Sequence, residues 1–268
     1  MSDRTRLIFR KGGEPFYQCL DCSFRFQVPA VNANLMATHD DFDKAYIQYL
    51  EETPEDTINF TDLLKRLHLC AGDGVRVLDV GCGSGKFVKF LRARSIEAYG
   101  LEPSPALYRE YLSHFPYFLN TTVEELAETW PGAFDVLTAL DVVEHVERPR
   151  DFIMSCSRLL KPHGVFLVST PDVKSIPAKL FARRWHFYHK WHLSYFSRPV
   201  LESTLTSAGF LVHEAGHCGR RRSLGYTLQY AVNYLSSGTS ISVPAVLNRI
   251  ALPINTFDVL YVQAEKKA

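Results

Sequence analysis

The stretch VLDVGCGSGKF, residues 77–87, decides the fold, because an apolar run that contains an aspartate leads into glycines at alternate positions. A glycine-rich turn between a strand and a helix lets the main chain approach a ligand closely. A dinucleotide site requires G-x-G-x-x-G, whereas Gly81, Gly83 and Gly85 are spaced G-x-G-x-G. Lys86 stands where the third glycine belongs. The spacing therefore disfavours a dinucleotide.

A nucleoside-triphosphate loop is also disfavoured, because Gly81 to Lys86 is one residue too short and Phe87 replaces the magnesium-binding hydroxyl. Two acidic residues favour another ligand. Glu102 ends the next predicted strand, where a carboxylate can accept hydrogen bonds from both ribose hydroxyls. Asp79 can order the turn or face a cationic group. S-adenosylmethionine fits, since it carries ribose hydroxyls and positive charge but no phosphate.

From residue 75 onward, short aliphatic or β-branched runs alternate with segments of helical periodicity. This alternation predicts βαβ units, a mostly parallel sheet and an α/β fold. The predicted strands are 75–80, 97–102, 134–140, 164–170, 210–215 and 258–265. The predicted helices are 85–93, 105–114, 122–128, 148–160 and 198–208.

The first part of the chain is organised differently. Residues 15–28 alternate aromatic and polar side chains around Cys19 and Cys22, which predicts a short β-ribbon. Residues 41–52 and 53–70 show helical spacing.

Two later segments, 171–199 and 217–257, follow strands at the end of the sheet where ligands bind in open α/β folds. We expect both to cover a substrate. The sequence thus predicts an N-terminal β-ribbon extension over 1–40 and a larger domain over 41–268 that contains these two insertions.

The composition is ordinary for a soluble globular protein, with 46% apolar and 22% charged residues among 268. Thirty basic and 29 acidic residues give a formal net charge of +1, so neither a nucleic-acid partner nor stable membrane insertion is expected. The start has no apolar leader, which predicts a cytoplasmic protein. The six scattered cysteines indicate reduced thiols.

These motifs resemble the class I S-adenosylmethionine-dependent methyltransferases, and in particular the ubiquinone-type O-methyltransferases. The resemblance covers about residues 75–215 and rests on VLDVGCGSGKF, AYGLEPSP, FDVLTALDVVEHVERPRDFI, LLKPHGVFLVSTPD and WHLSYFSRPVLESTLTSAGF. It implies a Rossmann-like, seven-stranded sheet of order 3214576 with helices on both faces. The last strand would be antiparallel, and INTFDVLYVQAEKK is suited to it.

The resemblance also implies which residues bind S-adenosylmethionine. They are Asp79, Gly81, Cys82, Gly83, Gly85, Glu102, Pro103, Thr122, Leu140 and Asp141. The glycine turn would frame the methionine portion, Glu102 the ribose and Pro103 a face of the adenine. Thr122, or its neighbour Thr121, matches an adenine-edge position that is often aspartate in this family. Leu140 and Asp141 would line the methyl-donor side.

Methyl transfer is an in-line displacement, so the protein positions the acceptor and, for a hydroxyl, removes its proton. Two histidines are candidate bases: His145, which follows Glu144, and His192 in the first insertion. In ubiquinone-type enzymes the residues matching Asp141, Glu144 and His145 have been linked to catalysis or to a divalent metal. Three ligands on adjacent turns do not define a metal site, and none is assigned. Glu144 and His145 could instead be a half-buried pair that opens the next helix.

Aromatic residues in the first insertion either wall an acceptor pocket or simply pack: Trp185, Phe187, Tyr188, Trp191 and Tyr195. The basic groups at 183–190 and 220–222 either bind an anionic acceptor or are solvated loop charge. Tyr46 and Tyr49 are predicted to close over the cofactor.

Cys19 and Cys22 resemble the second knuckle of a zinc ribbon that precedes some family members. The first knuckle is missing, so we expect a degenerate ribbon used for packing or for contact in a homodimer. The function predicted overall is O-methylation of a small-molecule hydroxyl of sugar, quinone or natural-product type. N- or C-methylation, or an inactive cofactor-binding partner protein, are the alternatives.

Overall fold

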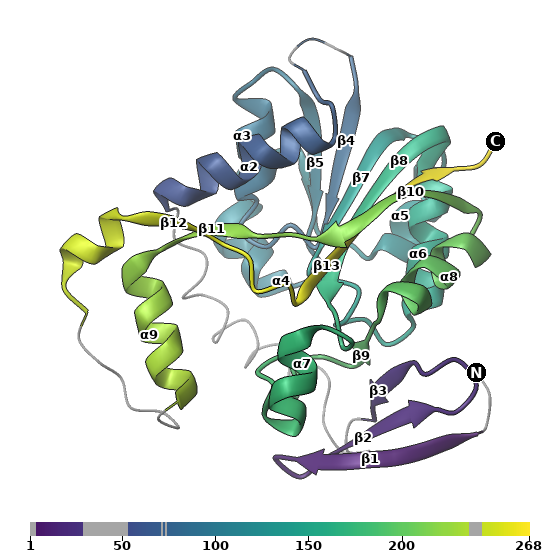
Figure 1. Ribbon diagram of the computed structural model, residues 1–268. Coiled ribbons are helices and arrows are strands. Elements are labelled where there is room, and N and C mark those ends of the chain that lie inside the picture. Colours follow the sequence, from purple (N-terminus) through teal and green to yellow (C-terminus); the bar gives the residue numbers. More distant parts are fainter. Residues whose placement is uncertain (1–3, 29–52, 71, 73, 236–242) are drawn as a thin grey trace.

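The structure is a computed structural model that describes residues 4–28, 53–70, 72, 74–235 and 243–268 (Figure 1). Seven strands form the central sheet in the order β10-β13-β8-β7-β4-β5-β6, which is 3-2-1-4-5-7-6 in domain numbering, taken from β6 to β10. Their bounds are β4 Arg76–Val80, β5 Glu97–Leu101, β6 Phe118–Leu119, β7 Phe134–Leu140, β8 Leu160–Pro171, β10 Phe210–His217 and β13 Val259–Lys266.

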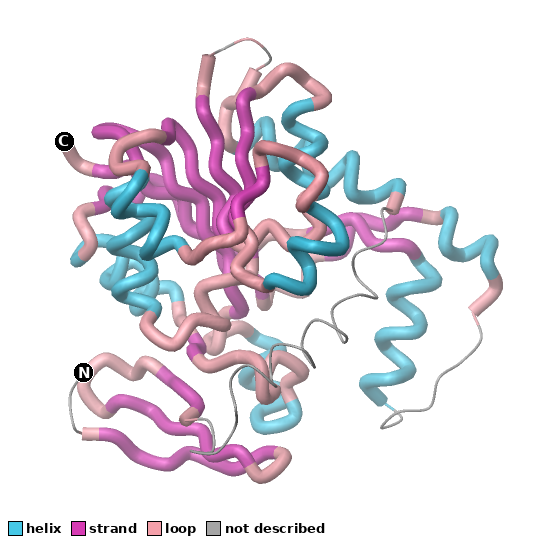
Figure 2. Tube along the Cα trace, turned by 180° about the vertical axis from the view of Figure 1, so that it is seen from behind, coloured by secondary structure: helices cyan, strands magenta, loops and turns pink. Residues whose placement is uncertain are grey.

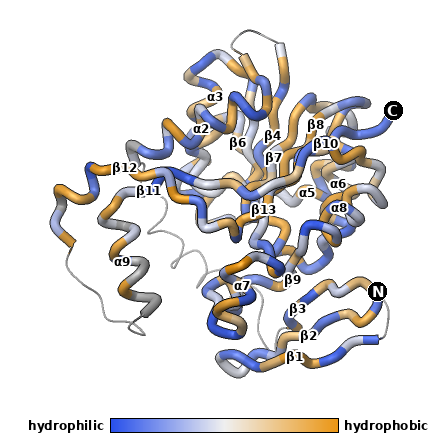
Figure 3. The backbone as a smooth tube through the Cα atoms, viewed as in Figure 1, coloured by the Kyte–Doolittle hydropathy of each residue, from blue (hydrophilic) through white to orange (hydrophobic). Residues whose placement is uncertain are grey.

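The pairing is parallel from β8 to β6, and β13 runs antiparallel to both of its neighbours. The expected α/β fold with a seven-stranded, mostly parallel sheet is therefore confirmed. Figure 3 shows mainly hydrophobic residues along β7 and β8, as strands covered on both faces require. β6 is absent from the strands predicted by periodicity, because a strand of two residues carries no periodic pattern.

Helices cover both faces of the sheet (Figures 1 and 2). One hydrophobic cluster joins it to α5 Val123–Thr129, α6 Pro149–Leu159 and α8 Arg198–Ser207. A second cluster joins the other face to α2 Pro54–Arg66 and α3 Lys86–Arg92. These bounds agree with the predicted helices to within a few residues.

The predicted helix at 105–114 is the exception. It consists of α4 Pro105–Leu107 and a π-helical turn, η2 Tyr108–Leu112. The Ser113 amide donates to the Tyr108 carbonyl at 2.8 Å, which is the five-residue spacing of a π-turn. Periodicity alone does not distinguish this from an α-helix.

The N-terminal region forms a second sheet, larger than the predicted ribbon. Its order is β1-β2-β3-β9, from β1 Thr5–Lys11, β2 Glu14–Cys19, β3 Arg25–Gln27 and β9 Ser194–Tyr195. The fourth strand thus comes from the first insertion. Phe16 packs with Trp185, Tyr188 and Tyr195 in a separate core. These three aromatic residues are at most 1% exposed, so they pack rather than wall an open pocket.

The two insertions contribute short elements beside the sheet. The first holds α7 Ile176–Phe181 and η3 Ala182–Arg184. We call residues 185–193, which lead into β9, the cap loop. The second holds β11 Arg220–Ser223, α9 Leu224–Leu235, η4 Ala245–Arg249 and β12 Ala251–Ile254. β11 and β12 pair as a two-stranded ribbon that passes α2 (Figure 1).

Some predictions fall outside the described residues: the helix at 41–52 with Tyr46 and Tyr49, and the boundary between 40 and 41. Among the helices that the structure does describe, none has the length and hydrophobicity needed to cross a membrane.

Candidate functional site

The site lies where β4, β5 and β7 end. These strands are parallel neighbours, so their carboxyl ends meet at one edge of the sheet. The glycine turn follows β4, Glu102 follows β5, and residues 141–145 follow β7. The topology therefore brings together the segments that the sequence singled out.

The turn after β4 has a conformation that requires glycine. Gly81, Gly83 and Gly85 have φ angles of +69°, +56° and +73°. The Gly81 amide donates to the Leu101 carbonyl at 2.8 Å, which holds the turn against β5. A Cβ atom on Gly85 would lie 2.3 Å from Phe118 Cζ. Position 85 therefore has no room for a side chain, and only glycine fits there.

Glu102 holds this turn through its side chain. Its Oε2 accepts from the Gly83 amide at 3.0 Å, and its Oε1 accepts from the Ser104 amide at 2.9 Å. The residue is 7% exposed. A carboxylate oxygen has two lone pairs, so it can accept from a main-chain amide and from a ligand hydroxyl at the same time.

Asp79 lies beneath the turn and is buried. The Thr138 hydroxyl donates to its Oδ1 at 2.6 Å. Burial raises the pKa of the Asp79 carboxyl to about 7, although the bond from Thr138 acts in the opposite direction. A cationic ligand group beside Asp79 would favour its charged form.

Asp141, the first residue after β7, has a φ of +58°. Its Oδ1 accepts from the Ser169 hydroxyl at 2.8 Å, and its Oδ2 pairs with the Arg220 guanidinium. Burial alone would raise the pKa of Asp141, but Arg220 and Ser169 outweigh it and hold the pKa below its ordinary value. Sequence reasoning missed this pair, because Arg220 lies in the second insertion.

Glu144, His145 and His192 form one cluster. Their ligand atoms all lie within 4.8 Å of one another, and the two imidazole rings are 4.7 Å apart between centroids. Glu144 is 1% exposed and His192 5%. Both Glu144 oxygens and His192 Nδ1 have no hydrogen-bond partner in the part of the chain that the structure describes. The two candidate bases are therefore members of one site.

The cap loop fixes the tautomer of His145. Its Nδ1 lies 2.9 Å from the Trp191 carbonyl, which can only accept, so Nδ1 carries the proton and Nε2 holds the lone pair of the neutral ring. The Trp191 amide in turn donates to His189 Nδ1 at 3.3 Å. The amides of Leu193 and Ser194 donate to the Glu144 carbonyl at 2.8 and 3.0 Å.

Burial sets the proton affinities in the cluster. It raises the pKa of Glu144 well above its ordinary value, and the nearby Asp141 charge acts in the same direction. Burial also lowers the pKa of His192, and it lowers that of His189 to about 3. The two histidines therefore stay neutral at neutral pH, and burial disfavours the charged form of Glu144.

The resemblance linked Asp141, Glu144 and His145 to catalysis or to a divalent metal, and the sequence assigned no metal site. Asp141 is engaged by Arg220 and Ser169, and His192 takes its place beside Glu144 and His145. Two imidazoles and one carboxylate are suitable ligands for a borderline divalent cation. The unpartnered Glu144 and His192 atoms fit such an ion.

The other residues predicted to bind the cofactor are a helix cap and three residues at the ligand edge of the sheet. Thr122 is the N-cap of α5, where its hydroxyl accepts from the Glu125 amide at 3.2 Å. Pro103 is exposed, and Leu140 and Cys82 are half-buried at the same edge of the sheet. Sequence reasoning did not single out four further groups of the site: Thr138, Ser169, His189 and the Trp191 carbonyl. No local pattern marks Thr138 or Ser169. The dense run of histidines at 186–192 was the available signal.

Comparisons with known proteins identify the family and a similar fold. A family profile described as "Methyltransferase domain" matches residues 47–215. The ubiquinone biosynthesis O-methyltransferase of Dechloromonas aromatica is 38% identical over 103 residues, which are 36% of this chain and 44% of that protein. Its namesake from Pseudomonas aeruginosa strain LESB58 is 35% identical over 115 residues, or 41% and 49%.

The chain spans about half the length of the curated relatives it matches. Among solved structures, a SAM-dependent methyltransferase from Archaeoglobus fulgidus superposes with a TM-score of 0.56 at 17% identity. That match covers 82% of this chain and 99% of the other, and it shows a similar fold.

Proposed function

The chain belongs to the methyltransferase domain family, and from this premise we propose that it transfers the methyl group of S-adenosylmethionine to a hydroxyl of a small molecule. One observation supports a hydroxyl acceptor above all. An imidazole with a fixed tautomer, His145, stands at the end of β7, beside the strand end that carries the glycine turn. A base so placed serves a hydroxyl, which must lose a proton as the methyl group arrives.

The cofactor is proposed to lie across the ends of β4, β5 and β7. The glycine turn faces its methionine portion, and the charged form of Asp79 favours its cationic groups. Glu102 accepts from the ribose hydroxyls while it also accepts from the amides of Gly83 and Ser104. Pro103 and Thr122 lie toward the adenine, while Leu140 and Asp141 lie toward the sulfonium.

In the proposed mechanism, His145 Nε2 accepts the hydroxyl proton while the acceptor oxygen attacks the methyl carbon in line. The sulfonium leaves as a neutral thioether, so the protein has no developing anion to stabilise there. The Trp191 carbonyl stabilises the imidazolium that forms, because it already accepts from Nδ1. Burial raises the pKa of Glu144 well above its ordinary value and so disfavours its charged form.

Glu144, His145 and His192 are also the residues that would hold a divalent cation. Such an ion would supply Lewis-acid activation of the acceptor hydroxyl. The proposal does not depend on it, because a neutral imidazole suffices as a base near pH 7.

The test measures S-adenosylhomocysteine release with a panel of hydroxyl, amine and carbon acceptors. We expect turnover of a hydroxyl acceptor, and His145→Ala should lower kcat by about 100-fold or more, the usual contribution of a general base. His114→Ala is the control, because His114 is exposed and precedes β6 at the opposite edge of the sheet.

Three results would contradict the proposal. Absence of S-adenosylhomocysteine binding in calorimetry would rule out the cofactor. Turnover of amine or carbon acceptors only, with full rate in His145→Ala, would favour N- or C-methylation. Cofactor binding without turnover of any acceptor would favour an inactive partner protein.

A further inference from the structure

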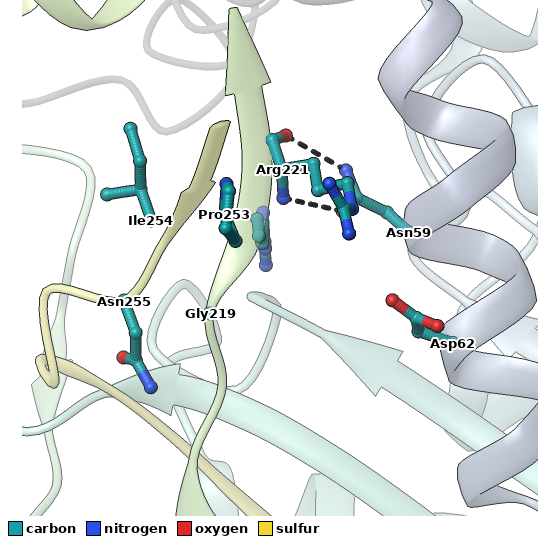
Figure 4. A pocket seen from close by; sticks show the side chains of 8 residues that line it. Asn59, Asp62, Gly219, Arg221, Pro253, Ile254 and Asn255 are labelled. Atoms are coloured by element: carbon teal, nitrogen blue, oxygen red, sulfur yellow. Dashed lines mark hydrogen bonds between the residues drawn. The ribbon is translucent and has the colours of Figure 1, made fainter. Parts of the chain in front are cut away.

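A small pocket of about 200 Å³ lies between α2 and the β11–β12 ribbon, outside the catalytic cluster (Figure 4). Asn59 and Asp62 line it from α2, and Arg220 and Arg221 line it from β11. Ile254, at the end of β12, is part of the opposite wall. The pocket thus combines an apolar wall with two guanidinium groups.

Asn59 holds the main chain of Arg221 at both its carbonyl and its amide. The Asn59 amide group donates to the Arg221 carbonyl at 3.2 Å, and Asn59 Oδ1 accepts from the Arg221 amide at 2.7 Å. These two bonds replace the strand partner that β11 lacks on this side (Figure 4). Arg221 is therefore presented from a rigid main chain rather than from a solvated loop.

The Arg221 guanidinium has no salt bridge, hydrogen bond or aromatic partner among the residues that the structure describes, although the residue is half-buried. A guanidinium withdrawn from water without a counter-ion is unfavourable, and its planar donors suit a carboxylate or phosphate. Asp62 does not satisfy it. Its side chain is 61% exposed and pairs with Lys65 at 3.3 Å.

The pocket also reaches the catalytic edge. Arg220, which lines it, pairs with Asp141, and Asp141 is three residues before Glu144 on the same segment. The negative charge of Asp141 neutralises Arg220, whereas Arg221 has no ion pair within the part of the chain that the structure describes. Asp141 also interacts electrostatically with His145, so Arg220, and Arg221 beside it, stand on the side of the sheet that carries the cluster.

We propose that this pocket binds an anionic group, a carboxylate or a phosphate, of the methyl acceptor, with Arg221 as its principal ligand. The inference rests on the proposed function, in which the methyl acceptor is the substrate. It adds that the substrate carries a hydroxyl at one end and a negative charge at the other. Arg221 then determines specificity and takes no part in proton transfer.

The first experiment titrates inorganic phosphate and, separately, acetate into the full chain saturated with S-adenosylhomocysteine, and follows arginine Nε–H signals by NMR. The Arg221 signal is assigned from its loss in Arg221→Gln. We expect saturable binding of at least one anion and about tenfold weaker affinity, or more, in Arg221→Gln. Arg249→Gln is the matched control, an exposed arginine of the same insertion that does not line the pocket.

Equal anion affinity in wild type and Arg221→Gln would overturn the proposal, as would the absence of saturable binding. The preferred anion identifies the group as carboxylate or phosphate. S-adenosylhomocysteine affinity should be the same in both proteins. A loss of it in Arg221→Gln would assign the pocket to the cofactor carboxylate and overturn the acceptor assignment. A wild-type chain that ignores S-adenosylhomocysteine but binds phosphate would refute the proposed function alone.

The second experiment compares hydroxyl acceptors in pairs, each carboxylate with its neutral amide. Arg221→Gln should raise KM for the carboxylate by about tenfold or more and change kcat by less than about twofold. The KM of the amide should not change. Equal effects on both members of a pair would contradict a charge-specific subsite.

Discussion

Replacing Glu102 by glutamine tests the junction between the glycine turn and β5. The wild-type carboxylate accepts from two main-chain amides, Gly83 at 3.0 Å and Ser104 at 2.9 Å, in a position that is 7% exposed. Glutamine keeps one acceptor oxygen and sets an NH2 group against the other amide. One charge-assisted bond is lost and one buried N–H is left unpaired, each worth about 1 to 3 kcal/mol. We expect the unfolding free energy to fall by about 2 to 4 kcal/mol.

The same change should weaken cofactor binding. A ribose hydroxyl loses a charged acceptor, so the Kd for S-adenosylhomocysteine should rise by about 10- to 100-fold, the equivalent of about 1.4 to 2.8 kcal/mol. Urea denaturation measures stability, and titration calorimetry of the folded variant measures affinity. Glu97→Gln is the control at the other end of β5, since the exposed Glu97 accepts at the surface from Arg76 and from the Tyr99 hydroxyl, and its replacement should cost under about 1 kcal/mol.

The two readouts separate two roles of Glu102. Lower stability with an unchanged Kd would show that the carboxylate only holds the turn, and the ribose assignment would be refuted. Unchanged stability and affinity together would refute the reasoning from hydrogen bonds altogether.

Three further changes test other parts of the structure. Asp79 has a folded pKa of about 7 against 3.8 unfolded, so the folded state holds an extra proton between these values. The unfolding free energy of the ligand-free protein should therefore fall by about 2 kcal/mol from pH 5.5 to 7.5 and should vary less in Asp79→Asn; urea titrations at both pH values check this. Gly85→Ala forces a Cβ at φ +73° to within 2.3 Å of Phe118, which should lower stability by about 2 to 4 kcal/mol; wild-type stability of this variant would contradict the described turn. Arg25 donates to the Tyr188 hydroxyl at 2.7 Å, and a double-mutant cycle of Arg25→Ala with Tyr188→Phe should give a coupling of about 1 kcal/mol or more; strict additivity would show that the bond does not form.

The sequence was most informative where neighbouring residues act together. The aliphatic runs and helical periods located most of the central strands and helices, because both faces of the sheet are covered and burial imposes a regular pattern. The glycine spacing and Glu102 predicted a ligand site at the carboxyl ends of the strands, because the motif lies within a short stretch of sequence. The order of the strands came from the resemblance, since periodicity alone does not say which strands pair.

Long-range contacts could not be predicted in this way. His145 and His192 were separate candidates, and only the folded cap loop brings their rings together. The pairing of Asp141 with Arg220 likewise depends on how the second insertion returns to the sheet. No local sequence pattern predicts such side-chain contacts, because they depend on packing between segments that are distant in sequence.

The shared N-terminal sheet imposes an order on how the chain can fold. β3 pairs with β9 through Arg25 with Tyr195 and Phe26 with Ser194. A ribosome must therefore synthesise the chain through Tyr195 before β3 has its second neighbour. Until then β3 presents an open edge, the kind of surface that recruits foreign strands. Residues 25–27 are thus made long before they can reach their final surroundings.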